Sequence, residues 1–255
     1  MSTSFIKNIL LCSFITLLST SVQADVVDKI EKTFAVNDNT SFRLSNINGS
    51  VAIRSWENST IKVIATVAAD NQVDRDNMVI DMQQSGVEVS VETRYKEHES
   101  WRQNSHSGKV EYIVIVPINT NLSAINLVNG SLTIDNVKGA VHAELVNGSM
   151  KATGLASNSE VSSVNGSIEI SYSELTTPLD SIVVETVNGS IKLSVPKLLQ
   201  AKVEAETMHG SIKTDFGLSA TKSFFGGHNL SGEIGHGEVD ITMKSVNGSV
   251  KLLSH

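Results

Sequence analysis

The chain has 255 residues, with 20 lysines and arginines against 27 aspartates and glutamates, which gives a formal net charge of −7 at pH 7. An acidic chain without a basic cluster is a poor match for a nucleic-acid-binding protein, so we expect no nucleic-acid partner. The single cysteine excludes a disulfide or a thiolate metal site within one chain.

The N-terminus has the organisation of a secretory signal peptide over residues 1–24. Lys7 supplies the positive charge, an apolar run extends from Ile9 to Leu18, and Val22-Gln23-Ala24 is a small-residue cleavage site. The apolar run is about half of the ~20 residues that span a bilayer, and no other apolar stretch is long enough. We therefore expect cleavage after Ala24, no transmembrane segment in the mature chain, and a periplasmic, cell-surface or secreted location.

Residues 25–118 are predicted to form a less regular N-terminal β-strand region that contains a first coil and hairpins. Alternating apolar residues mark the strands, and Gln84-Ser85-Gly86 fits a hairpin turn. No stretch of the mature sequence has convincing helical periodicity or capping. The expected strands are Thr60–Ala68, Met78–Met82, Val87–Thr93 and Val110–Val116.

One phrase recurs along the chain: an apolar residue, then Asn-Gly-Ser, then an apolar-x-apolar run. From Asn129 to Asn147 to Asn165 the interval is 18 residues each time. A fixed interval favours a parallel β-solenoid, in which each copy forms one coil. The phrase occurs at Asn48, Asn129, Asn147, Asn165, Asn188 and Asn247, with histidine in place of asparagine at His209 and, more loosely, at His236.

The apolar positions of the phrase predict where the chain turns. Counted from the Asn or His, positions −4, −1, +3 and +5 are apolar in nearly every copy. A straight strand alternates its faces, so −4 and −1 cannot both point inward unless the chain turns or bulges between them. A second turn is expected at the glycine, which accepts a positive φ. Stacked asparagines are expected to hydrogen-bond along the axis.

These patterns indicate an all-β fold. We predict a single-stranded parallel β-helix, or β-solenoid, with Val-Asn-Gly-Ser turns over residues 119–255, in one continuous domain with residues 25–118. Asn-Gly between apolar runs is also a strong hairpin signal, so the alternative is an antiparallel β-sandwich. The solenoid is favoured because hairpins do not require equal intervals.

Candidate metal ligands lie at the turns and on the outward positions. His209 and His236 replace asparagine, and neutral imidazole is a common metal ligand. Glu185 and Glu206 share position −3; on adjacent coils they would lie about 5 Å apart and repel each other unless a cation bridged them. Calcium is the cofactor hypothesis for this pair. The competing interpretation is a solvated charged face with no cofactor.

Candidate ligand contacts are also outward. Position +4 carries Lys192 and Lys213 within a mostly basic strip, which suits an extended polymer. Trp101 lies in the polar segment Tyr95–Lys109 and is a candidate to stack on a sugar; the alternative is a ring that packs back against the sheet. No histidine or acid recurs beside the repeated serine, so we expect no catalytic residue.

The order of these motifs resembles a broad bacterial family of exported β-strand-repeat proteins, described as candidate adhesins and otherwise of unknown function. The resemblance covers essentially the whole mature chain. It rests on NGSVAI at Asn48 followed by Trp56, VEYIVIVP ending at Pro117, the run of VNGS coils, and GEIGHGEVDI before the final VNGSVKL. It implies a β-solenoid, an envelope location and no known catalytic residues.

We therefore expect an exported, non-enzymatic envelope protein that binds, in the manner of an adhesin, or scaffolds through a rigid elongated surface. Its partner would be a cell-envelope polymer or protein, or a second copy of the chain. One alternative is a self-assembling filament, with the strand Val250–Leu253 as a free edge. A polysaccharide-degrading enzyme is a further alternative, on fold analogy alone.

Overall fold

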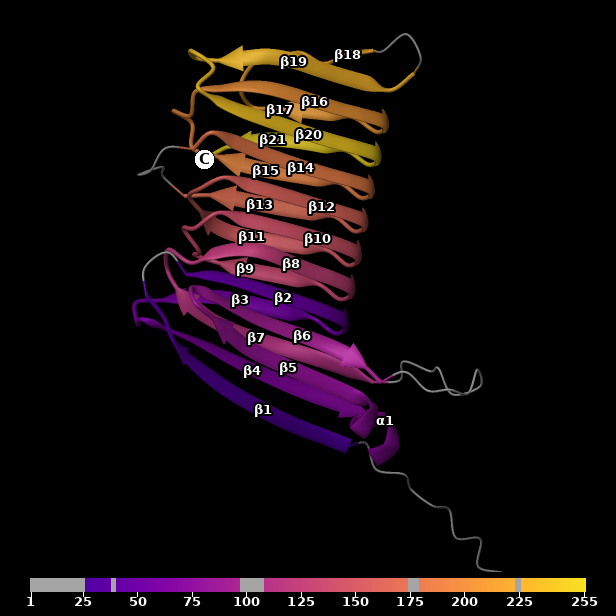
Figure 1. The fold of residues 1–255 in the computed structure, drawn as a ribbon. Helices are drawn as coiled ribbons and strands as arrows, with labels where there is room; N and C mark the ends of the chain where they lie inside the picture. Colours follow the sequence, from indigo (N-terminus) through magenta and orange to yellow (C-terminus); the bar gives the residue numbers. More distant parts are fainter. Residues whose placement is uncertain (1–25, 38–39, 97–107, 174–178, 223–225) are drawn as a thin grey trace, which may run out of the picture.

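Two long β-sheets lie face to face in the computed structural model, which describes residues 26–37, 40–96, 108–173, 179–222 and 226–255 (Figure 1). The expected signal peptide and Trp101 lie outside the described residues. The core fills the space between the sheets and forms one continuous apolar cluster that draws on both the N-terminal region and the repeats.

Sheet A has ten strands and sheet B has eleven. The spatial order in sheet A is β1 (Val26–Ala35), β4 (Thr60–Ala69), β7 (Lys109–Pro117), β3 (Val51–Trp56), β9 (Leu132–Asp135), β11 (Met150–Leu155), β13 (Ile168–Tyr172), β15 (Ile191–Val195), β21 (Val250–Ser254) and β17 (Ile212–Thr214). The order in sheet B is β18 (Thr221–Lys222), β19 (His228–Ile234), β16 (Ala201–His209), β20 (Val239–Asn247), β14 (Ser181–Asn188), β12 (Ser159–Asn165), β10 (Val141–Asn147), β8 (Asn121–Asn129), β2 (Ser41–Asn48), β6 (Glu88–Tyr95) and β5 (Met78–Ser85).

Each regular copy of the phrase forms one coil: a strand of sheet B, the Asn-Gly-Ser turn, and a strand of sheet A. Successive coils pair in parallel, as β10 does with β12 and β11 with β13. Side chains alternate along each strand, so that Met150 and Ala152 are buried while Lys151 between them is exposed. The predicted parallel solenoid is confirmed. The antiparallel sandwich is wrong for the repeats, because the Asn-Gly turn joins strands of different sheets instead of a hairpin within one sheet.

Antiparallel strands cover the ends of this stack. At one end β4 pairs antiparallel with β1 and β7, and β5 with β6; at the other end β19 pairs antiparallel with β16. The four strands expected between residues 60 and 116 are present, and Gly86, with φ 58, turns the predicted hairpin. The sequence patterns do not predict the short helix α1 (Gln72–Asn77), which begins after Asn71. The Asn71 Oδ1 accepts a hydrogen bond from the Asp74 N–H at 2.9 Å.

The order of the coils in space differs from their order in the sequence. The C-terminal coil, β20 with β21, lies between the coil of β14 and β15 and the coil of β16 and β17, so the C-terminus lies within the stack (Figure 1). At the other end, β2 and β3 lie between β6 and β7 on one side and β8 and β9 on the other. The strand Val250–Leu253 is therefore not a free edge, because β21 pairs with both β15 and β17. The filament hypothesis assumed that this strand is an unpaired sheet edge, and that assumption is wrong.

The turn glycines are required by the close approach of stacked backbones. Among them only Gly49 has a positive φ, at 115, so the expected left-handed conformation is wrong for the later turns. A Cβ on Gly148 or Gly166 would lie 2.0 Å from the carbonyl oxygen of the glycine in the coil below. No side chain larger than hydrogen fits that distance.

The turns are held by two further ladders. From Asn129 onward, each asparagine Nδ2 donates to the Oδ1 of the asparagine in the preceding coil of the stack at 2.7–2.9 Å, which confirms the predicted asparagine ladder. In spatial order the asparagine ladder is Asn48, Asn129, Asn147, Asn165, Asn188 and Asn247. Hydroxyls two residues before the turn, at Thr186, Ser245 and Thr207, donate to the neighbouring glycine carbonyls at 3.1, 2.9 and 2.7 Å.

Two buried tyrosines predict alkaline unfolding. Burial raises the pKa of Tyr112 to about 12 and raises the pKa of Tyr172 still further. An unfolded tyrosine ionises near pH 10, so above that pH the unfolded state binds fewer protons than the native state and stability falls as pH rises. We expect the free energy of unfolding to be constant up to about pH 9 and to fall between pH 10 and 12, by up to about 1.4 kcal/mol per pH unit for each tyrosine, and the urea midpoint to fall with it.

The measurement is a series of urea titrations followed by circular dichroism, with tyrosinate absorbance recorded in parallel. Tyr112→Phe should make the fall shallower, because one of the two groups is removed. Ionisation of all three tyrosines near pH 10 with the dichroism unchanged would contradict the prediction.

Candidate functional site

The outer face of sheet B carries a row of exposed apolar side chains. Ala143 and Leu145, at positions −4 and −2, point inward and are buried, whereas Val146 at −1 points outward and is 42% exposed. The expected turn or bulge between −4 and −1 is absent from β10, so the inward placement of −1 is wrong. We call the −1 residues the valine row: Ile47, Val128, Val146, Val164, Val187, Val246 and Met208.

The valine row forms the floor of a shallow groove. Two hollows of about 400 and 430 Å³ lie along it and share Ser162 and Val164, so together they cross seven coils. Six spacings of about 4.8 Å give the groove a length of about 29 Å. Apart from Ile47, which is half-buried, the members of the row are 39–44% exposed. An in-register apolar row of this length is unusual on a charged surface.

Carboxylates border the groove on the side away from the turns. Position −3 carries Glu144, Glu185 and Glu206, and position −5 carries Glu160 and Glu204. Two amines on this face, those of Lys244 and Lys202, pair with carboxylates, at 3.2 Å from Glu185 and 3.5 Å from Glu204. His142 lies between the carboxylates of Glu144 and Glu160, at 3.4 and 3.3 Å. We call Glu144, Glu160, Glu185, Glu204 and Glu206 the acidic border.

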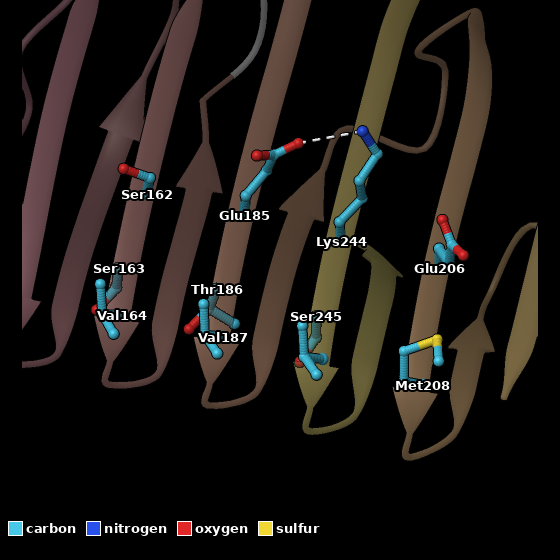
Figure 2. Close-up of a pocket in the computed structure, with 11 residues that line it drawn as sticks. Ser162, Ser163, Val164, Glu185, Thr186, Val187, Glu206, Met208, Lys244 and Ser245 are labelled. Carbon is cyan, nitrogen blue, oxygen red and sulfur yellow. Dashed lines mark ion pairs between the residues drawn. The ribbon is translucent and has the colours of Figure 1, made fainter.

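The structure separates the two glutamates of the calcium hypothesis. Glu185 and Glu206 are not on adjacent strands, because Lys244 of the inserted β20 pairs in register with both (Figure 2). The Lys244 amine already neutralises Glu185, so a calcium ion bridging these two carboxylates has no basis in the geometry. Calcium binding elsewhere on the protein stays a prediction.

The candidate histidines also lie apart. His209 is the last residue of β16 and pairs in register with Asn247, the last member of the asparagine ladder. His236 lies near the other end of β16, where its backbone N–H donates to the side chain of Gln200, the residue before β16. The length of β16 therefore separates them, about 30 Å at the usual rise per residue. His236 lies in the turn that joins β19 to β20 and belongs to no coil. Among the described residues, no three histidine, cysteine, aspartate or glutamate side chains are grouped to hold a metal ion.

Lys192 and Lys213 lie on the outer face of sheet A, on the side of the molecule opposite the groove. They are not neighbours, because Lys251 pairs in register with both. The Lys192 amine lies 3.1 Å from Glu169 Oε1, and this hydrogen bond lowers the pKa of the Glu169 carboxyl. Trp101 lies outside the described residues, so its proposed sugar contact stays a prediction.

The groove offers several kinds of side chain for contact with a partner. Its surface offers aliphatic side chains, ladder amides and carboxylates. Outside the groove, burial lowers the pKa of the Lys138 amine. This amine donates hydrogen bonds to the Gly154 carbonyl at 2.6 Å and to the Ser173 hydroxyl at 2.8 Å.

Comparison with solved structures finds a similar fold in a bacterial protein. A protein from Clostridium sporogenes described as a "putative cell adhesion protein" is 11% identical, with a TM-score of 0.50 over 90% of this chain and 100% of its own. A "putative adhesin" from Bacteroides fragilis is 10% identical, with a TM-score of 0.41 over 88% of this chain and 97% of its own. At these identities the likeness concerns the fold alone. No curated protein sequence matches the chain.

No helix in the described part of the chain has the length and apolar character needed to cross a membrane. The family profile called Toastrack DUF4097 matches residues 118–253, which is more than half of the chain and contains all but the first of the coils. The expected kinship with the β-strand-repeat candidate adhesins is confirmed. The chain therefore belongs to the Toastrack DUF4097 family.

Proposed function

We propose that this protein is an exported, non-enzymatic binding protein of the cell envelope, adhesin-like or scaffolding, which holds an elongated partner in the groove of sheet B. The observation that carries the proposal is the valine row. Six of its side chains are 39–44% exposed and in register on parallel strands, so covering them removes apolar surface from water along the whole groove. The regular stack beneath supplies a rigid support, which lowers the entropy cost of binding.

The partner that fits this groove is a protein segment with an apolar stripe bordered by basic side chains. The apolar stripe would cover the valine row, and the basic side chains would face the acidic border, where carboxylates outnumber amines. An amphipathic helix about 19 residues long would match the groove of about 29 Å. The description of the Clostridium sporogenes relative agrees with an adhesive function, and the signal peptide expected over residues 1–24 supports an envelope location.

The test is co-sedimentation of the chain from residue 25 onward with peptidoglycan, outer-membrane and extracellular-polysaccharide fractions. Val164→Thr/Val187→Thr/Val246→Thr keeps β-branched side chains on the strands but makes the groove floor polar. We expect pelleting with a protein-containing fraction, and at least a fivefold loss of it in this variant. The control is Val27→Thr/Val73→Thr/Val87→Thr, which changes three other valines that are 60–66% exposed.

The contrary outcomes are distinct. Equal pelleting of both triple variants would remove the groove from the proposal. Pelleting that survives protease treatment of the fraction would exclude a protein partner. Pelleting without any fraction would indicate a second copy of the chain as the occupant.

A further inference from the structure

The geometry points to a second binding site, independent of the groove: Lys192, Lys251 and Lys213 on the outer face of sheet A bind a linear polyanion. These three residues, the lysine row, lie on the consecutive strands β15, β21 and β17. Lys251 is the register partner of both Lys192 and Lys213. Adjacent strands are about 4.8 Å apart, so the row presents one cation per strand.

Only one of the three lysines in the row forms an ion pair within the described part of the fold. Lys192 pairs with Glu169, but among the described residues neither Lys251 nor Lys213 has a carboxylate within ion-pair distance. Like charges placed directly opposite each other on neighbouring strands destabilise a sheet. The two unpaired cations in register, Lys251 and Lys213, therefore cost the folded chain free energy that a bound anion would recover.

The surroundings of the lysine row suit a charged polymer. Along one side run the serines of the turns. The Ser249 N–H donates to the Ser190 Oγ at 3.2 Å, and the Ser211 and Ser249 hydroxyls lie 3.3 Å apart. These serines place a hydroxyl group beside each lysine of the row. Lys151 continues the row beyond Glu169, so four of the five successive strands from β11 to β17 carry a lysine at this position.

The net charge of −7 does not oppose binding at this face. The acidic border lies on the outer face of sheet B, and the two stacked sheets are separated by about 10 Å. At physiological ionic strength the screening length is about 8 Å, so a polymer on sheet A interacts mainly with the lysines beneath it. The two faces of the repeats thus recognise opposite charges.

The ligand class is an extended polymer that repeats a carboxylate or phosphate group at about the spacing of the coils. Two probes distinguish the sources of negative charge: polygalacturonate supplies carboxylates and long-chain polyphosphate supplies phosphates. Dextran, which is neutral, should not bind. A carboxylate polymer and a phosphate polymer each present several anionic groups to the lysine row at once. The free energies of the single contacts then add to one overall binding free energy.

The experiment measures the affinity of labelled polymer for the chain from residue 25 onward at several salt concentrations. Lys192→Gln/Lys213→Gln/Lys251→Gln should weaken binding at least tenfold and flatten the salt dependence. Lys29→Gln/Lys197→Gln/Lys222→Gln removes the same charge at three other exposed lysines and should retain binding. The corresponding triple Lys→Arg variant of the row should also bind, which separates loss of charge from misfolding.

Binding of either polymer by the native chain with loss only in the Gln variant of the row supports the site, and the polymer bound identifies the acidic group. Absence of binding to both polymers would overturn it. Equal weakening in the two Gln triples would also overturn it, because the effect would then follow net charge. The groove variant Val164→Thr/Val187→Thr/Val246→Thr should bind polymer normally, so a failure here is distinguishable from a failure of the proposed function.

Discussion

Deletion of residues 238–255 is expected to unfold the protein, although these are the last residues of the chain. They form β20 and β21, which fill the space between two other coils and pair with strands on both sides. Five of their apolar side chains are buried: Val239, Ile241, Met243, Val250 and Leu252. At about 1.5–3 kcal/mol each, their burial is comparable to the whole stability of a typical domain, about 5–15 kcal/mol.

The shortened chain cannot easily close the gap. Moving β16 next to β14 would place Glu206 directly opposite Glu185, without Lys244 between them. Circular dichroism and urea titration of the shortened chain test the prediction, with a chain that lacks only His255 as the control. Addition of a separate peptide of residues 238–255 should restore the native spectrum. A shortened chain that unfolds cooperatively at the native urea midpoint would contradict the expectation.

The second large effect is expected for Gly166→Ala. The added Cβ would lie 2.0 Å from the Gly148 carbonyl oxygen and 2.5 Å from its carbon, and these are backbone atoms in a ladder that continues on both sides. The coils must move apart or the turn must deform, which breaks the asparagine hydrogen bonds at that level. Overpacking typically costs about 1–3 kcal/mol, and a backbone contact this short places the loss at or above the upper end.

Gly217→Ala is the informative control. Gly217 has φ 73, but no atom lies within 4 Å of the position of its Cβ, so the variant reports the conformational cost without a clash. We expect its urea midpoint to fall less than that of Gly166→Ala. A loss in Gly166→Ala no larger than that in Gly217→Ala would contradict the expected clash between stacked turns.

The coil is the part of the fold that the sequence predicts well. Equal intervals, the Asn-Gly turn and apolar positions +3 and +5 define its shape, and Asn147 and Asn165 stack as expected because identical residues recur at identical places. The same regularity hides the order of the coils, since any copy can stack on any other. One sign of the order is that terminal repeats are atypical. The coil with His209 and Met208 departs most from the consensus, and it is the last coil of the stack.

The groove was harder to predict from sequence. An apolar residue before every Asn-Gly is easily seen, but period-two alternation alone assigns Val146 to the core or to the surface with equal ease. In the later copies a hydroxyl residue at −2 indicates the direction. Thr186 and Ser245 turn inward because their hydroxyls satisfy buried glycine carbonyls, which leaves position −1 on the outside. Long-range insertion likewise placed Lys244 beside Glu185, which no local pattern encodes.

Insertion of the last coil also sets the sequence of events in folding. In an ordinary repeat array each unit can add to the one made before it, so assembly follows synthesis. Here β16 has no partner on its inner side until β20 arrives, and β20 is made about thirty residues later. The strands β20 and β21 therefore complete the interior of the stack, and a chain interrupted before residue 239 lacks a coil in the middle of the fold and not at one end.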